Sequence, residues 1–338
     1  MQKVRLGFIG AGFISQLVHL PSFYFDPRVK IVAISDLDKE LLKKVSKKYQ
    51  IQKTYTSHKK MLKDEKLDGI ILVTRRDKNE SVAKDVINAG ISLFSEKPAA
   101  LSYKSAKKLW NLSKKKKTKY VIGYMKRHDN GILYLKNKIE KNKLGNLLSV
   151  YYKAFLGDSY SNPFEYFKHS DKNYRKKNSL NRNFKNKKFV FLKYLNSHCH
   201  HINLMRHLFG ELKLDYKDLS NKGEGFVFFK TKKNAKIIFN NQFSSSKRWI
   251  DDIQMNFEKG SIYAKLPAPL LKNIPTEILI ENYENGNVDK PWIPWGWSFR
   301  NQANSFVDYI ISSKAIKSQC LAKEFIEDIK LIETIFKK

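Results

Sequence analysis

Two glycines and the residues after them have the types and spacing of a loop that binds a dinucleotide. Gly10 and Gly12 follow the apolar run Val4–Ile9 and precede a helical pattern. One glycine there makes a tight turn, and the second lets the backbone approach a pyrophosphate. The N–H groups that follow, at Phe13 and Ile14, would then face the phosphates from the positive end of a helix.

An acidic residue closes the next apolar run. Asp36 follows the strand-like segment 30–35, at the position where a carboxylate accepts hydrogen bonds from an adenosine ribose. A carboxylate would repel a 2′-phosphate, so we expect NAD(H) to be preferred over NADP(H). The alternative is that Gly10 and Gly12 only turn the chain and that Asp36 only caps the next helix. Strand, turn, helix and acid together favour the cofactor site.

The elements that must position these residues alternate along positions 1–123. Expected strands cover residues 4–9, 30–35, 69–74, 91–94 and 120–123, and expected helices cover residues 13–24, 37–49, 81–89 and 102–113. Strands that are apolar on both faces and alternate with helices predict a parallel sheet covered by helices. The first domain is therefore expected to be an α/β, doubly wound Rossmann domain.

Residues 124–338 follow a different pattern. Expected helices cover residues 132–141 and 300–311, and strand-like runs cover residues 147–155, 226–230, 236–243, 250–257, 261–266 and 277–283. This predicts an α+β domain with an open, mainly antiparallel sheet for substrate binding and oligomerisation. The Asn-, Lys- and Tyr-rich stretch 159–188 is expected to be a long loop. An open sheet face exposes apolar area, so a homodimer or homotetramer is expected.

The charge is high but diffuse. The chain has 338 residues, with 65 Lys+Arg against 32 Asp+Glu, and 55 of the basic residues are lysines spread along the sequence. Proteins that read nucleic acids use arginine forks and clustered patches, so we expect no specific nucleic-acid partner; charge-driven binding remains an alternative. No apolar run reaches the ~18 residues of a membrane span, and no signal peptide is expected. The two cysteines favour a reducing cytoplasm.

Several motifs together resemble one oxidoreductase family. The stretch 7–23 (GFIGAGFISQLVHLPSF), the tripeptide Glu96-Lys97-Pro98 and the segments 143–146 and 299–307 are similar, in order, to the Gfo/Idh/MocA family. This is the group of glucose–fructose oxidoreductase, inositol dehydrogenase and rhizopine catabolism proteins. The resemblance implies a Rossmann domain, a second domain on an open mixed sheet, and hydride exchange between NAD(P) and sugar-like substrates.

The resemblance also assigns residues on the nicotinamide side. It places Lys97 between nicotinamide and substrate, beside Glu96, where an ammonium can stabilise alkoxide character and take part in proton transfer. By composition alone Lys97 would be one surface lysine among many; its place in Glu-Lys-Pro after a strand favours catalysis. Thr74 is retained from the family's signature, whereas Arg75 replaces a proline and Asn79 a common histidine.

A histidine-rich helix follows in the second domain. Counting back from Gly210 places His200 on the family's catalytic histidine. Asn196 and Asn203 then stand where the family has carboxylates. An amide cannot stabilise imidazolium as a carboxylate does, so His200 should be a weaker base. Either proton transfer depends more on Lys97, or the protein works mainly as a ketone reductase, or activity is lost.

Further substrate contacts are expected from Tyr124 and Arg127, which follow the last Rossmann strand, and from Asn196. The alternative for the first two is an ordinary linking segment. His198, His200, His201 and His207 raise zinc binding as an alternative, but no further ligand completes a tetrahedral site. No metal is expected.

The sequence therefore predicts an NAD(H)-dependent oxidoreductase that acts on a secondary alcohol or ketone of a sugar, cyclitol or nucleotide-linked sugar. The alternative is a catalytically weak nucleotide-binding protein of the same fold, with a redox-sensing or assembly role.

Overall fold

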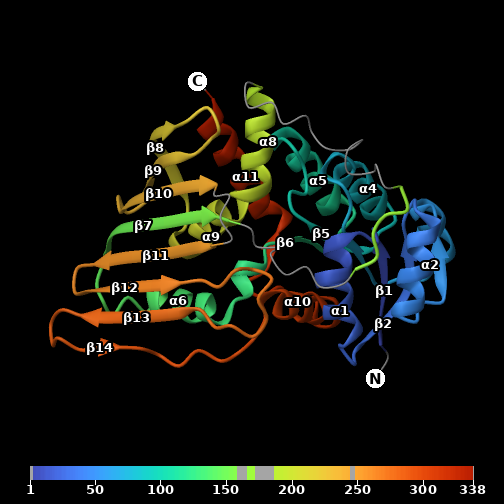
Figure 1. Ribbon diagram of the computed structural model, residues 1–338, viewed down its shortest axis with the longest axis horizontal. Coiled ribbons are helices and arrows are strands. Elements are labelled where there is room, and N and C mark those ends of the chain that lie inside the picture. The colour runs from blue at the N-terminus through green and yellow to red at the C-terminus, as the bar shows by residue number, and fades with distance from the viewer. Residues whose placement is uncertain (1–2, 158–165, 172–185, 244–247, 338) are drawn as a thin grey trace. The chain divides into compact units, whose positions relative to one another are not determined.

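The computed structural model describes residues 3–157, 166–171, 186–243 and 248–337. These residues divide into two compact units (Figure 1). The first unit comprises residues 3–124, 166–171 and 299–329, and the second comprises residues 125–157, 186–243, 248–298 and 330–337. Residues 299–329 thus pack with the N-terminal part of the chain.

The first unit is built on a sheet in the order β15-β6-β5-β4-β1-β2-β3. Its strands are β1 (Val4–Ile9), β2 (Val29–Ser35), β3 (Lys53–Tyr55), β4 (Gly69–Leu72), β5 (Ser92–Glu96), β6 (Tyr120–Gly123) and β15 (Cys320–Leu321). All pairings are parallel except that of β15 with β6. The order from β3 to β6 is that of a doubly wound Rossmann domain, which confirms the predicted fold class.

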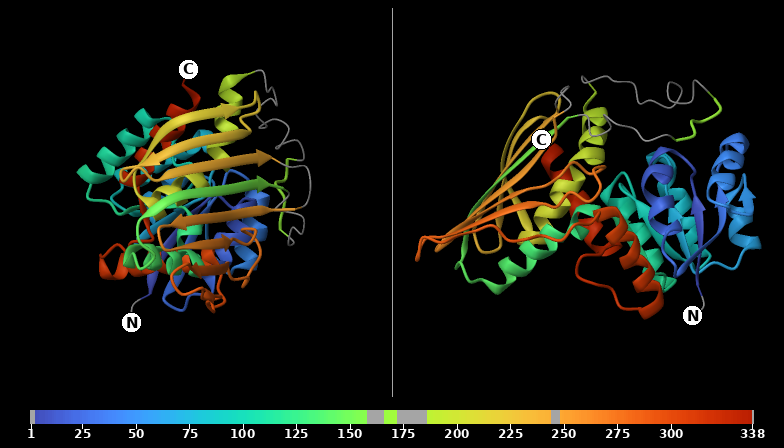
Figure 2. Two further views of the ribbon diagram at one scale, coloured as in Figure 1. Left: turned by 90° about the vertical axis from the view of Figure 1, so that its left-hand side faces the viewer. Right: turned by 60° about the horizontal axis from the view of Figure 1, so that its bottom comes forward.

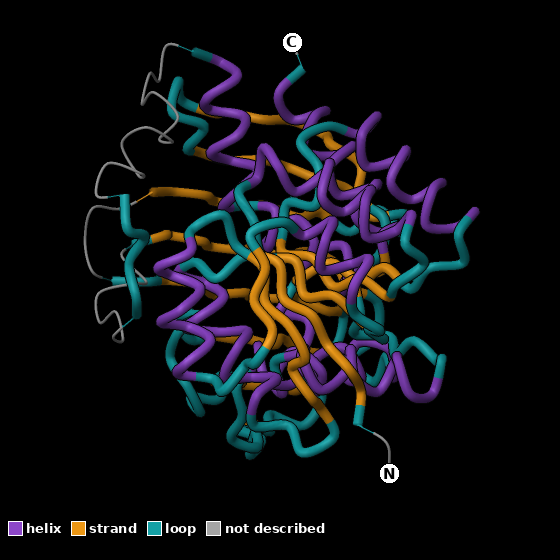
Figure 3. Tube along the Cα trace, turned by 90° about the vertical axis from the view of Figure 1, so that its right-hand side faces the viewer, coloured by secondary structure: helices purple, strands orange, loops and turns teal. Residues whose placement is uncertain are grey.

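Helices lie on both sides of this sheet (Figure 3). They are the π-helix η1 (Ser15–His19), α1 (Leu20–Tyr24), α2 (Lys39–Lys48), α3 (His58–Asp64), α4 (Arg76–Asn88), α5 (Tyr103–Lys115) and α10 (Ser298–Ser312), and α11 (Ala322–Phe336) continues into the second unit. Helix α10 belongs to this core because Ala303, Phe306 and Val307 are buried with Leu6 and Phe94. These apolar contacts explain why α10 packs with the first unit.

The second unit contains a sheet in the order β14-β13-β12-β11-β7-β10-β9-β8. Its strands are β7 (Leu147–Leu156), β8 (Leu212–Leu219), β9 (Gly225–Thr231), β10 (Lys236–Phe243), β11 (Ile250–Phe257), β12 (Gly260–Lys265), β13 (Glu277–Asn282) and β14 (Val288–Asp289). Only the pairing of β10 with β7 is parallel. The predicted mainly antiparallel sheet is therefore confirmed.

One face of this sheet is covered and the other is open. The helical elements of the unit are the 3₁₀ turn η2 (Met125–His128), α6 (Asn130–Lys141), α8 (Lys187–Ser197) and α9 (Cys199–Phe209). In the described part of the unit, no helix covers the opposite face of the sheet (Figure 2). Along β7, Val150, Tyr152 and Ala154 are buried, whereas the residues between them are half-buried. This period of two is typical of a sheet with one packed face.

Most of the stretch 159–188 lies outside the described residues, so the expected loop is not described there; α8 begins within it, at Lys187. Among the residues that the structure describes, no helix is long and apolar enough to span a membrane.

Candidate functional site

The glycine turn at the end of β1 can be occupied only by glycine at its first position. Gly10 has φ +101°, and a Cβ built there would lie 2.1 Å from the carbonyl oxygen of Val73. The Gly10 N–H donates to the carbonyl of Ser35 at 2.7 Å. The turn is therefore fixed between β2 and the end of β4.

Gly12 differs from Gly10 because its surroundings are open. A Cβ built on Gly12 would meet no heavy atom within 4 Å, and its φ is outside the positive range. Neither the backbone conformation nor the neighbouring atoms of the described residues require glycine here. A dinucleotide pyrophosphate held against the backbone would require it. The turn thus fits a phosphate-binding loop, with Phe13 and Ile14 immediately following and no side chain capping the helix at Ile14.

Asp36 is connected directly to this turn. Its Oδ2 accepts a hydrogen bond from the Ala11 N–H at 2.7 Å, and its Oδ1 accepts one from the Asp38 N–H at 3.1 Å. The structure thus brings together the predicted pyrophosphate-binding glycines and the predicted ribose-binding acid. They came from separate segments of the sequence, the ends of β1 and β2.

Lys97 lies in a loop that is held by polar contacts on both sides. Glu96 is the last residue of β5, and its Oε1 lies 2.7 Å from Nε2 of His19. Its Oε2 accepts a hydrogen bond from the Lys97 N–H at 3.1 Å. Burial alone would raise the pKa of Glu96, but the hydrogen bond and charge of His19 lower it below its usual value. Glu96 therefore acts as an ionised anchor for the backbone of Lys97.

Asn79 holds the same loop from α4. This buried amide donates to the carbonyl of Glu96 at 2.8 Å and to that of Pro98 at 3.1 Å. The Lys97–Pro98 peptide bond between these carbonyls is cis. In the sequence, Asn79 is recognisable only as a departure from the family pattern, because no sequence signal shows which carbonyls an amide reaches.

Thr74, the remaining residue expected near the cofactor, follows β4. Thr74 is half-buried just beyond β4, and Arg75 follows it as the residue preceding α4. The guanidinium of Arg75 pairs with Asp77, with Nε 3.1 Å from Oδ1. Arg75 is thus engaged within its own segment.

Tyr124 and Arg127 are both buried. Tyr124, at the end of the first unit, is 1% exposed and packs at 6.5 Å from the ring of Phe325. Arg127 is also 1% exposed, and its ε N–H donates to Asn203 Oδ1 at 2.7 Å. Asn203, at a position where a carboxylate was expected, therefore ties α9 to η2.

The predicted histidine lies near the start of α9. His200 and Asn196 are both half-buried, and the chain between them passes from α8 to α9 at His198. Asn196, Arg127 and His200 belong to the second unit, whereas the cofactor-side residues from Gly10 to Lys97, and Tyr124, belong to the first.

A buried ionic network in the second unit was not predicted. The Lys126 ammonium forms an ion pair with Asp251, whose Oδ1 also accepts a hydrogen bond from the Tyr152 hydroxyl at 2.6 Å. His201 Nε2 lies 3.7 Å from the same carboxylate. Lys126 and Asp251 are 125 residues apart, which is why sequence spacing gave no signal for this pair.

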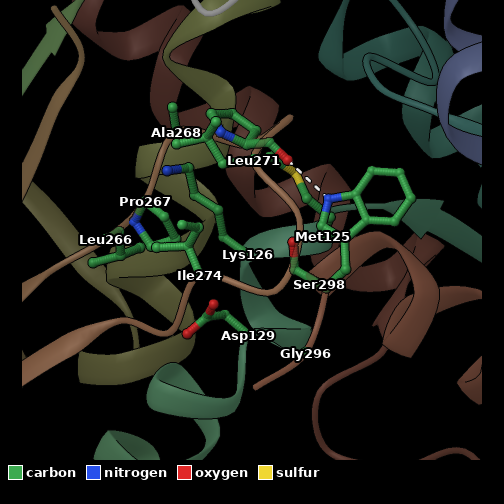
Figure 4. A pocket seen from close by; sticks show the side chains of 12 residues that line it. Met125, Lys126, Asp129, Leu266, Pro267, Ala268, Leu271, Ile274, Gly296 and Ser298 are labelled. Carbon is green, nitrogen blue, oxygen red and sulfur yellow. Dashed lines mark hydrogen bonds between the residues drawn. The ribbon is translucent and has the colours of Figure 1, made fainter. Parts of the chain in front are cut away.

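Lys126 also borders a pocket within the second unit (Figure 4). The pocket is lined by residues of three segments, 125–129, 266–274 and 296–298. The side chains of Lys126 and Asp129 lie there among apolar groups such as Leu266 and Ile274. The indole N–H of Trp297 donates to the Pro269 carbonyl at 3.1 Å, the dashed line in Figure 4. Trp297, directly before α10, thereby serves as a packed anchor.

The histidine cluster does not assemble a metal site among the described residues, where no group of three or more His, Cys, Asp or Glu side chains could hold an ion. His198 is fully buried between aromatic rings, including those of Tyr194 and Phe243. Neither of its ring nitrogens has a hydrogen-bond partner within the described part of the chain. Burial therefore lowers the pKa of His198 to about 3.

This burial predicts acid sensitivity that a single substitution should reduce. Below a pH of about 6.5, the unfolded chain protonates His198 while the folded chain does not until about pH 3, so stability falls through this window as pH decreases. Replacing His198→Phe should lessen the loss of unfolding free energy between pH 7 and pH 5 by about 2 kcal/mol. Urea unfolding at both pH values measures this, and an equal loss in the two proteins would contradict the assignment.

The N-terminal part of the chain is similar to a known family. Residues 4–124 match the family described as "Oxidoreductase family, NAD-binding Rossmann fold", GFO_IDH_MocA. Inositol 2-dehydrogenase from Salmonella paratyphi B is 27% identical over 165 residues, which are 47% of this chain and 48% of that protein. Rhizopine catabolism protein MocA from Rhizobium meliloti is 27% identical over 150 residues, 44% of this chain and 46% of that protein. The match thus spans about half the length of these curated relatives.

Solved structures share the fold along nearly the whole chain. The 3-ketoreductase KijD10 from Actinomadura kijaniata, in complex with NADP and TDP-benzene, has a TM-score of 0.76 at 11% identity, covering 99% of this chain and 97% of that one. At this identity the likeness concerns the fold alone. Residues 4–124, which contain the glycine turn, the acid and the Glu-Lys-Pro loop, are therefore similar to the NAD-binding Rossmann domain of the Gfo/Idh/MocA family of oxidoreductases.

Proposed function

We propose that the protein is an NAD(H)-dependent oxidoreductase acting on a secondary alcohol or ketone of a sugar, cyclitol or nucleotide-linked sugar. The observation that carries the proposal is the open space beside Gly12. The preceding residue, Ala11, donates its N–H to the Asp36 carboxylate. The inositol 2-dehydrogenases among the curated proteins similar to this chain support the substrate class. A bound nicotinamide would supply or accept the hydride.

In this proposal, the chain's own residues orient the reacting oxygen and manage its proton. Lys97 donates a hydrogen bond to that oxygen and stabilises its alkoxide character. Glu96 and Asn79 keep the loop of Lys97 in place through the contacts described above. His200 takes up or returns the proton, and Tyr124, Arg127 and Asn196 are proposed on the substrate side. With amides at 196 and 203, proton transfer depends more on Lys97.

Cofactor preference is proposed to depend on Asp36. The carboxylate beside the turn would repel the 2′-phosphate of NADPH, whereas KijD10 was solved with NADP. Replacing Asp36→Asn keeps an acceptor for one of the two N–H donors and removes the charge. We expect the ratio of NADPH to NADH dissociation constants to fall about tenfold, corresponding to about 1.4 kcal/mol. Isothermal titration calorimetry of both proteins measures this; an unchanged ratio would contradict the role of Asp36.

Substrate and reaction are tested together by a panel of sugars, cyclitols and nucleotide-linked sugars with NAD⁺, following the absorbance of NADH. The ketone forms are tested with NADH in the reverse direction. A substrate deuterated at the reacting carbon should pass its label to the nicotinamide. Binding of NADH without turnover of any panel member would instead favour the catalytically weak alternative, for which Asn196 and Asn203 are the supporting observation.

The open sheet face is proposed as a self-association surface. Strand registers align Tyr216, Phe228, Tyr151 and Tyr263 across this face, and Tyr216 and Tyr263 are exposed by 62% and 40%. Burying such a row favours a homodimer or homotetramer. The reducing cytoplasm is the compartment proposed from the two cysteines, which are both buried and form no disulfide.

A further inference from the structure

A short segment from a distant part of the chain lies against the glycine turn. Residues 166–171, called here the strap, belong to the first unit although they follow β7 in sequence. They appear as the yellow-green stretch beside α2 in Figure 1. Their contacts reach both predicted cofactor-binding groups of this unit, the glycine turn and the end of β2.

At the glycine turn, the strap is held by the amide of Gln16. The Phe167 N–H donates to Gln16 Oε1 at 2.8 Å, and Gln16 Nε2 donates to the Phe167 carbonyl at 3.0 Å. The same Nε2 donates to the carbonyl of Ala11 at 2.8 Å. One buried side chain therefore connects the strap to the turn itself. Beside it, the Tyr166 ring contacts Phe13 edge-on, with centroids 4.6 Å apart.

At the end of β2, the strap is held by Asp38. Its Oδ2 accepts a hydrogen bond from the Ser170 N–H at 2.7 Å and lies 3.3 Å from His169 Nδ1. Burial alone would raise the pKa of Asp38, but hydrogen bonds from Ser170 and Leu41 lower it. Asp38 in turn donates its N–H to Asp36. The strap thus connects to the predicted ribose-binding acid through a single residue.

We propose that the strap forms an outer wall of the dinucleotide site and slows release of the cofactor, with Gln16 and Asp38 as positioning residues; this rests on the proposed cofactor binding. Phe13 and Gln16 hold the strap near the proposed phosphate-binding turn, and Asp38 holds it near the proposed ribose-binding acid. A dinucleotide bound between these anchors would have to leave past the strap. Loss of an anchor should therefore affect dissociation more than association.

The test measures the NADH dissociation rate by stopped-flow displacement from the full-length protein. Gln16→Met keeps the side chain's size and apolar stem but removes its amide, and Tyr166→Ala removes the ring that contacts Phe13. Gln52→Met makes the same Gln-to-Met change at an exposed position outside the strap. We expect dissociation to become about tenfold faster in each strap variant, with the association rate changed less than threefold, and no change in Gln52→Met.

A second readout separates the strap from a general loss of structure. Lys168 is exposed within the strap, so trypsin cleavage after it should slow when NADH is added to the unmodified protein, and slow less in Gln16→Met. Dissociation rates that are equal in all four proteins would overturn the inference while leaving cofactor binding intact. Absence of any NADH signal from the unmodified protein would overturn both the inference and the proposed function.

Discussion

Turnover of the Lys97→Met variant is expected to fall by about 10²–10⁴-fold relative to the unmodified protein. Methionine keeps the length of the side chain but cannot donate a hydrogen bond to the reacting oxygen or transfer a proton. The loop itself should persist, because its anchors are backbone groups of residues 96–98 bonded by Asn79 and Glu96. Steady-state kinetics with the best substrate of the panel measures the loss, and calorimetry should give an NADH affinity within a few-fold.

Lys104→Met is the matched control, because Lys104 is an exposed lysine in the first turn of α5 and undergoes the same chemical change. Its turnover should equal that of the unmodified protein. If Lys97→Met retained full turnover, the catalytic role of Lys97 would be refuted, although dinucleotide binding would stand. If Lys97→Met lost NADH affinity as strongly as turnover, its role would be cofactor binding alone.

The Gly12→Ala variant is expected to fold normally and to bind NADH about 10–100-fold more weakly. The added methyl meets no protein atom within 4 Å, so the folded protein accommodates it without strain. A pyrophosphate against the same backbone would be displaced by it, and overpacking of this kind costs about 1–3 kcal/mol. The dissociation constant is measured by calorimetry and the unfolding free energy by urea titration.

Gly10→Ala provides the contrast within the same turn. Its methyl would lie 2.1 Å from the Val73 carbonyl at a φ of +101°, so this variant should lose folding stability as well as cofactor binding. If Gly12→Ala left NADH affinity unchanged, the space beside Gly12 would not be a pyrophosphate site. The two variants together separate a turn that only shapes the chain from one that binds a ligand.

The parts of the fold that were predicted from sequence are those with long apolar runs. β1, β6, β10 and β11 have the expected bounds, because each is a continuous or alternating apolar segment with clear ends. β3 was missed because its residues Lys53–Tyr55 are largely exposed, and β15 because it has only the residues Cys320 and Leu321. β8 was missed as well, because its residues are exposed or only half-buried. Helix α11 was also not among the expected elements, although the buried residues Phe325, Ile329 and Ile332 have the spacing of one helix face.

The candidate site likewise has parts that the sequence predicts and parts that it does not. Gly10, Gly12 and Asp36 could be predicted because a turn between strand and helix and an acid after the next strand are local features. The contacts that hold them are not local: Gln16 and Phe167 are 151 residues apart, and His19 and Glu96 are 77 apart. Such pairs depend on tertiary packing, which neither residue type nor spacing reports. Sequence alone therefore proposes the cofactor-binding groups, which remain a prediction, but it does not show what positions them.

The central claim is that the glycine turn and Asp36 bind a nicotinamide dinucleotide. It is tested most directly by calorimetric titration of the unmodified protein with NADH and with NADPH at physiological salt. The account predicts one site per chain, with tighter binding of NADH than of NADPH. Equal affinities would contradict the role of Asp36, and binding of neither nucleotide would contradict the central claim itself.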